Sequence, residues 1–114
     1  MGEKMSGGHK QLAEGRWKSL SFVEQMANVG SEIHRALNWK KKNNRDYCDR
    51  SFEQALELLA LTAENLKSPS ALKELMRLKE ALKDFFYGTN EFSSSEILWR
   101  KYFDHFNMAA RKTS

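Results

Sequence analysis

An arginine and a histidine near the end of the chain are the residue types best suited to chemistry on a phosphodiester. Arg100 and His105 enclose four residues in the segment RKYFDH. A histidine exchanges protons near neutral pH, as cleavage of RNA through its 2′-hydroxyl requires. An arginine offers a permanent, forked positive charge to a phosphate. The pair predicts a site in which Arg100 stabilises developing charge and His105 is the general acid or base.

The same two residues also fit a purely structural interpretation. Arg100 stands four residues from both Glu96 and Asp104, and ion pairs at this helical spacing add about 0.2–0.5 kcal/mol of stability. On a regular helix, five steps of about 100° place Arg100 and His105 about 140° apart. The two side chains therefore share a cleft only across a groove or with the help of a second subunit.

A second set of polar residues lies in the N-terminal half of the chain. Asn28, Glu32 and Arg35 follow one another at steps of four and three residues, so they form one strip on a helix. They are candidates for lining a polar cleft opposite the last helix, where they would supply a hydrogen-bond partner to His105. The alternative is that the strip is the solvated side of an amphipathic helix.

Capping signals and apolar spacing predict that these residues sit on four helices, near residues 21–43, 45–65, 70–87 and 95–111. Ser21 with Glu24 forms a capping box at the start of the first helix, and Ser93 with Glu96 forms another at the start of the fourth. Almost no alternating β-pattern is present. The expected fold is therefore all-α, an antiparallel four-helix bundle with short loops.

Helix ends and one patch of small residues add detail to this expectation. Pro69 suits the first position of the third helix, and Gly88 is expected to end that helix in a left-handed conformation. Ala27, Gly30 and Ser31 predict a close approach of another helix, within the bundle or across a dimer. The second helix has apolar residues around much of its circumference, which suggests contacts on more than one side. Together these features predict a homodimer.

The four helices, the basic charge and the Arg-x4-His spacing resemble the HEPN family of small helical proteins. Many HEPN proteins are metal-independent ribonucleases, and others are partners of nucleotidyltransferases. Their motif is an arginine, four to six residues, and a histidine on a late helix, and dimers line one cleft with two copies of it. The resemblance implies that Arg100 and His105 act on RNA. It covers the bundle in outline, about residues 17–112, with one match in local motif.

The composition of the chain limits which classes of binding partner can be expected. The formal charge of +4 is compatible with an anionic partner but does not require one. The run Lys40–Lys42, with Arg45 and Arg50 nearby, can contact phosphates or simply complement the helix dipole. The three tryptophans can stack on bases or pack in the core or an interface.

The chain also lacks the marks of several other classes of protein. Cys48 is the only cysteine, so no internal disulfide forms, and no metal or cofactor site is expected. No apolar run approaches the ~20 residues that span a bilayer, so no membrane association is expected. A cytoplasmic protein is the simplest expectation, with a flexible leader over residues 1–16 and one helical domain over residues 17–114.

Two functions of different kinds remain open on the sequence alone. One is a HEPN-like domain that binds or cleaves RNA. The other is a non-catalytic helical dimer or adaptor that binds a protein partner through exposed apolar surface. A basic cleft containing His105 would favour the first. A long apolar patch on one face of the bundle would favour the second.

Overall fold

The computed structural model describes residues 15–113, with side-chain placement to residue 112. Residues 1–14 of the predicted leader therefore lie outside the described part. Every regular element between residues 15 and 113 is helical, which confirms the all-α prediction. No helix in this range is long and apolar enough to cross a membrane.

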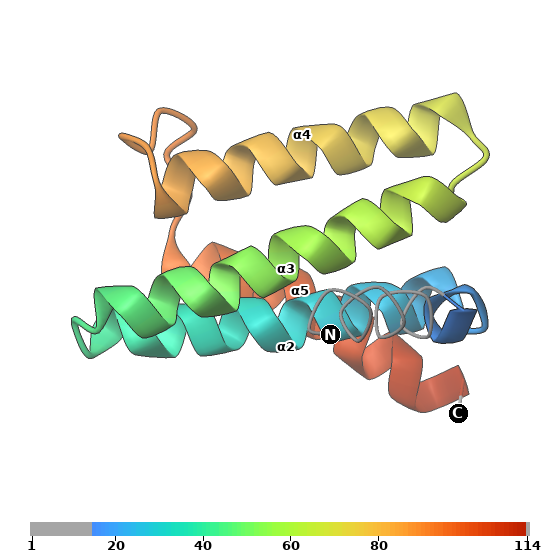
Figure 1. Cartoon of the computed structure of the whole chain (residues 1–114), viewed down its shortest axis with the longest axis horizontal. Coiled ribbons are helices and arrows are strands. Elements are labelled where there is room, and N and C mark those ends of the chain that lie inside the picture. Colours follow the sequence, from blue (N-terminus) through green and yellow to red (C-terminus); the bar gives the residue numbers. More distant parts are fainter. Residues whose placement is uncertain (1–14, 114) are drawn as a thin grey trace, which may run out of the picture.

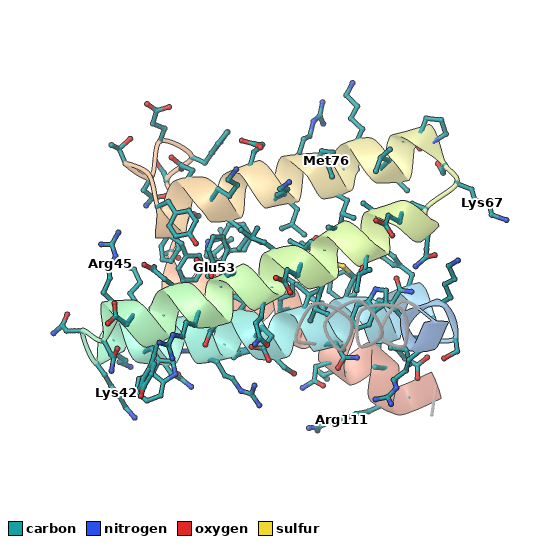
Figure 2. All side chains as sticks on the ribbon, in the orientation of Figure 1. Lys42, Arg45, Glu53, Lys67, Met76 and Arg111 are labelled. Atoms are coloured by element: carbon teal, nitrogen blue, oxygen red, sulfur yellow. The ribbon has the colours of Figure 1, made fainter. Side chains whose placement is uncertain are left out.

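Four long helices follow a helical turn at residues 15–18 (Figure 1). They are α2 (Phe22–Lys41), α3 (Arg45–Asn65), α4 (Pro69–Phe86) and α5 (Glu96–Thr113). These bounds differ from the predicted ones by no more than two residues. Successive helices run in opposite directions, with α4 along one side of α3 and α5 behind α2 (Figure 1). In Figure 2, Lys42 and Arg45 mark the end of the molecule where α2 meets α3, and Lys67 marks the opposite end.

Local capping explains why three of the helices begin where they do. Ser21 and Glu24 form the predicted capping box, with Oγ of Ser21 accepting from the Glu24 amide at 3.1 Å. The side chain of Asn44 accepts from the Tyr47 amide and caps α3. Ser68 caps α4, and Pro69 occupies the first helical position as predicted.

The predicted N-cap of α5 is wrong by two residues, although the predicted first residue of the helix differs by only one. Oγ of Ser95, and not that of Ser93, accepts the amide of Leu98 at 3.2 Å. The reason lies in the preceding loop, where the side chain of Asn90 holds Ser94 through its amide, its hydroxyl and its carbonyl. Ser93 is left with a φ of 54° and cannot serve as an extended N-cap. α5 therefore begins at Glu96, just after the segment that Asn90 holds.

The predicted left-handed conformation of Gly88 is also wrong, because no glycine in the described part has a positive φ. The amide of Gly88 donates to the carbonyls of Lys83 and Asp84, and the chain turns without entering the left-handed region. A Cβ on Gly88 would lie 3.0 Å from the Asp84 carbonyl oxygen. Glycine is needed here for close approach, and Asn90 supplies the positive φ two residues later.

The core lies around α2, which contacts both α3 and α5 closely, while α3 contacts α4 less extensively. The apolar residues at helical spacing on α2 are Phe22, Met26, Val29, Ile33 and Leu37, and all except Phe22 are buried. From the other helices the largest fully buried side chains are Phe52, Leu59, Leu82 and Phe103. Trp17 closes one end of the core, because its indole N–H donates to Oγ1 of Thr62 at 3.0 Å.

α2 and α5 approach each other closely where they cross at Gly30. A Cβ built on Gly30 would lie 2.9 Å from Cβ of Phe103. Only a residue without a side chain allows the backbones to come so near. The predicted close approach at Gly30 is therefore confirmed, and its partner is a helix of the same chain.

Candidate functional site

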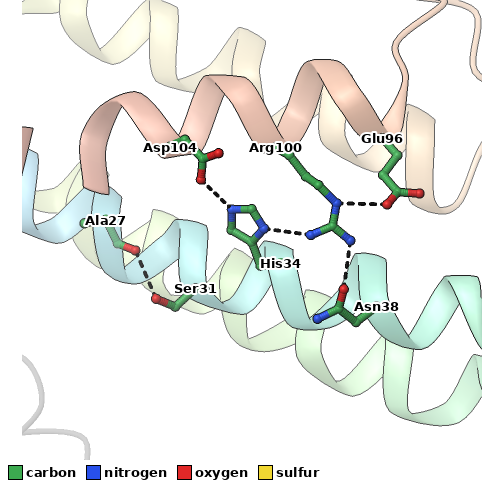
Figure 3. A network of polar contacts seen from close by, with 7 residues as sticks. All are labelled: Ala27, Ser31, His34, Asn38, Glu96, Arg100 and Asp104. Atoms are coloured by element: carbon green, nitrogen blue, oxygen red, sulfur yellow. Dashed lines mark hydrogen bonds and ion pairs between the residues drawn. The ribbon is translucent and has the colours of Figure 1, made fainter. Parts of the chain in front are cut away.

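Arg100 lies at the centre of a polar cluster between α2 and α5 (Figure 3). Its Nε donates to Oε2 of Glu96 at 2.8 Å, one turn earlier on α5. Its two terminal nitrogens reach across to α2, where Nη1 is 2.9 Å from Nδ1 of His34 and Nη2 donates to Oδ1 of Asn38 at 2.8 Å. The other ring nitrogen of His34, Nε2, is 3.1 Å from Oδ1 of Asp104. The cluster thus connects two helices that are more than 60 residues apart in sequence.

The contacts of His34 select one tautomer of its ring. A guanidinium can only donate, so Nδ1 of His34 must accept from Arg100. The ring proton then sits on Nε2 and donates to the Asp104 carboxylate. Both ring nitrogens of His34 are engaged within the protein. A general base needs one ring nitrogen free to meet its substrate, so His34 is not poised for acid–base catalysis in this arrangement.

Charge in the cluster is partly shielded from water. The side chain of Arg100 is 27% exposed and that of His34 is 30% exposed, whereas Asp104 is 57% exposed. The hydrogen bond from Arg100 lowers the pKa of the Glu96 carboxyl, with nearby lysines adding to this effect. Arg100 keeps one N–H on each terminal nitrogen beyond those already donated. The arrangement is best suited to holding α2 against α5.

The structure does not bring the predicted pair together. His105 is exposed on α5, on the flank about 140° from Arg100. The helical ion pair between Arg100 and Glu96 is present, as the structural interpretation expected. Asp104 pairs with His34 and not with Arg100. Any joint action of Arg100 and His105 would therefore need groups from outside the described chain.

The side-chain hydrogen bonds and ion pairs of Asn28, Glu32 and Arg35 among the described residues all lie within α2. The side-chain amide of Asn28 donates to the Glu24 carbonyl, and Arg35 pairs with Glu32 at 2.8 Å. Within residues 15–113 none of the three bonds to His105. The strip lies on the side of α2 away from α5, because the face toward α5 is formed by Gly30 and the residues of the polar cluster. A cleft between this strip and α5 is therefore not formed.

Sequence reasoning missed His34 and Asn38. A usable signal was present, because His34 and Asn38 are four residues apart on one helix, as Arg100 and Asp104 are on another. Two polar pairs of equal spacing can face each other where antiparallel helices cross. To predict that Arg100 contacts His34 and not His105, one must also know how α2 and α5 are placed relative to each other. No local sequence pattern gives this placement.

An apolar groove lies apart from the polar cluster, between α4, α5 and the start of α2. It has a volume of about 290 Å³, and its walls are Phe22, Met26, Ala71, Glu74, Leu75, Leu78, Tyr102 and Phe106. Phe106 makes edge-on contacts with the rings of Phe22 and Tyr102. Burial raises the pKa of the Tyr102 hydroxyl, and the Glu74 carboxylate adds to the rise, so this phenol stays neutral. The groove therefore presents apolar walls with one carboxylate.

Neither the polar cluster nor the groove resembles a metal centre. Within the described range, no group of three or more His, Cys, Asp or Glu side chains is placed to hold a metal ion. Comparison of the chain with protein-family models, curated proteins and solved structures finds no match. The HEPN resemblance therefore stays a prediction, and function has to be argued from the geometry.

Proposed function

We propose that this chain is a non-catalytic protein-binding module, an antiparallel four-helix bundle left open between α4 and α5. The observation that supports the proposal is the apolar groove. Its aromatic rim is partly exposed at Phe22 and Tyr102, although aromatic side chains gain most from full burial. α4 and α5 have almost no close backbone contact in the described part of the chain.

The proposed occupant is an amphipathic helix of a protein partner. The α4 wall runs from Ala71 to Leu78, about 10 Å along the helix axis, which matches two turns of a helix. Such a helix would place apolar residues at spacings of three and four against the groove. Among the described residues Glu74 is the only charged one that lines the groove, so a lysine or arginine on the flank of the partner helix would complement it.

The test uses two model peptides of equal length that differ only in charge. One alternates leucine and lysine in an amphipathic helical pattern, and the other replaces every lysine by glutamate. We expect the leucine–lysine peptide to shift the amide resonances of residues lining the groove, and the leucine–glutamate peptide to shift them far less. Shifts confined to other surfaces, or equal shifts from both peptides, would refute the proposal.

A matched pair of variants sharpens this test. Ala71→Trp fills the groove from its wall without removing a core side chain, and should abolish the shifts. Ala60→Trp places the same ring on an exposed position of α3 and should leave them unchanged. Circular dichroism of both variants checks that the helices are intact. Self-association, predicted from the sequence, stays a proposal and is tested separately below through α5.

RNA cleavage, which the HEPN resemblance implies, ranks second. It requires Arg100 and His105 in one cleft, and Arg100 is already hydrogen-bonded to Glu96, His34 and Asn38. Its test is incubation of the protein with a mixed RNA pool in the presence of a chelator. Cleavage that is lost in His105→Ala, with an unchanged melting temperature, would place this function first.

A further inference from the structure

Exposed cations and aromatic rings gather where α2 meets α3, at the end of the molecule marked by Lys42 and Arg45 in Figure 2. We define this α2–α3 corner by Trp39, Lys40, Lys41, Lys42, Arg45, Tyr47 and Arg50. All five of its cations are exposed. We propose that the α2–α3 corner binds single-stranded nucleic acid, with cations meeting phosphates and Tyr47 stacking on a base.

The first observation is a row of four side chains, with two aromatic rings between two cations. Nζ of Lys42 lies 5.2 Å from the ring centroid of Trp39, and the Trp39 and Tyr47 rings are 4.8 Å apart. The guanidinium carbon of Arg50 lies 5.6 Å from the Tyr47 ring. The row thus reads cation, ring, ring, cation. Base stacking on aromatic rings between cations is how proteins hold single strands without reading their sequence.

Tyr47 is the ring best placed to accept a base. It is 45% exposed, whereas Trp39 beneath it is partly covered. A base in a duplex already has both faces stacked, so an exposed ring offers more to an unpaired base. This argument selects a single strand over a double helix.

The second observation is a pocket on the neighbouring side of the same corner. It has a volume of about 180 Å³ and is lined by Lys40, Asn43, Asn44, Arg45, Cys48, Asp49 and Phe86. Lys40 is held over the Phe85 ring, with Nζ 5.6 Å from its centroid. Arg45 is held by Asp49 at 3.7 Å, and the pocket adjoins both the negative end of the α2 dipole and the positive end of the α3 dipole, which oppose each other. Two positioned cations in the pocket, Lys40 and Arg45, favour a phosphate.

Three nearby carboxylates reduce the charge of the five corner cations to a net +2. Asp46, Asp49 and Glu53 are the carboxylates on the same turns of α3, and only Asp49 forms an ion pair with a corner cation among the described residues. Burial and Asp49 raise the pKa of the Cys48 thiol, so the pocket does not hold a reactive thiolate. Binding by charge and stacking remains, without covalent chemistry.

The test is fluorescence anisotropy with labelled oligouridine of about 12 nucleotides, a length within the site sizes of single-strand binders. We expect binding at about 50 mM salt that weakens at least tenfold at about 200 mM, because phosphate contacts release counterions. Oligothymidine of the same length should bind comparably, and a duplex more weakly. No binding of oligouridine at low salt, or tighter binding of the duplex, overturns the proposal.

Two variants locate the surface. Lys41→Gln with Lys42→Gln should weaken binding at least fivefold, and Tyr47→Leu should weaken it about tenfold by removing one base stack. The charge-matched control combines Lys67→Gln, at the opposite end of the molecule (Figure 2), with Lys73→Gln, near the start of α4. It should change affinity less than twofold. Equal losses from both double variants, or no loss in Tyr47→Leu, would overturn the proposal.

Two further experiments distinguish nucleic-acid binding at the α2–α3 corner from binding of other partners. Phosphatidylserine vesicles that retain the protein while oligouridine does not would identify an anionic membrane surface and overturn the proposal. Ala71→Trp, which fills the apolar groove, should leave oligouridine binding unchanged. Failure at the α2–α3 corner would therefore leave the peptide-binding proposal intact, and the reverse also holds.

Discussion

At Arg100 the choice of arginine over lysine matters, because three acceptors surround the side chain from different directions. An ammonium keeps the charge but cannot span Glu96, His34 and Asn38 at once. We expect Arg100→Lys to lower the free energy of unfolding by about 1 kcal/mol, with the partial exposure of the cluster limiting the loss. Urea denaturation followed by circular dichroism measures it.

Arg77 provides the control for this change. It is exposed and pairs only with Glu74, at 3.3 Å and helical spacing, so Arg77→Lys should cost under about 0.5 kcal/mol. Losses of equal size at the two positions would mean that the bonds across to α2 add nothing.

Glu96 should make stability depend on acidity. Because the hydrogen bond from Arg100 lowers its pKa in the folded state, the carboxylate stabilises the fold above its ordinary pKa. This contribution is lost as the pH falls through the lowered pKa. Between about pH 6 and about pH 3, the melting temperature of the wild-type protein should therefore fall further than that of Glu96→Gln. Parallel falls in the two proteins would exclude this linkage.

At the scale of elements, the crossing of α2 and α5 depends on Gly30. Alanine would favour the helix by up to about 1 kcal/mol, but its Cβ would meet Cβ of Phe103, which sits beside the α5 backbone and cannot swing away. We expect Gly30→Ala to lower the free energy of unfolding by about 1–2 kcal/mol. The comparison is Gly15→Ala, where nothing lies within 4 Å and no loss is expected. A gain in stability at Gly30 would mean that the helices separate freely.

At the scale of the whole molecule, the two features that predicted a homodimer are both explained by contacts within one chain. The small patch around Gly30 receives Phe103, and the broad apolar coverage of α3 is used by α2 on one side and α4 on the other. What remains is the outer face of α5, where Ile97 is 69% exposed and Met108 is 59% exposed. This face keeps self-association open as a prediction.

Sedimentation at micromolar concentration tests it. We expect a dimer that Ile97→Asp dissociates, because a carboxylate cannot be buried against an apolar face without a partner. Ala60→Asp, on an exposed position of α3, should leave the dimer intact. A wild-type monomer would remove the prediction.

The helices themselves could be predicted because their signals are local. Ser21 bonds to Glu24 three residues away, Pro69 needs no amide partner, and the apolar stripe of α2 follows from helical spacing alone. The N-cap of α5 could not be predicted as well, because side chains from α4 and the loop, Asp84 and Asn90, hold the residues before it.

The partner of Arg100 was decided by tertiary structure. The motif in the sequence paired Arg100 with His105, five residues away, and gave no reason to consider His34. A helix turns by about 100° per residue, so the nearer histidine in sequence points away while the distant one faces Arg100 across the helix crossing. The depth of that crossing depends on the missing side chain of Gly30 against Phe103, a contact between residues 73 positions apart. Spacing along one helix therefore identified the reactive residue types, and only the packing of α2 on α5 determined which of them meet.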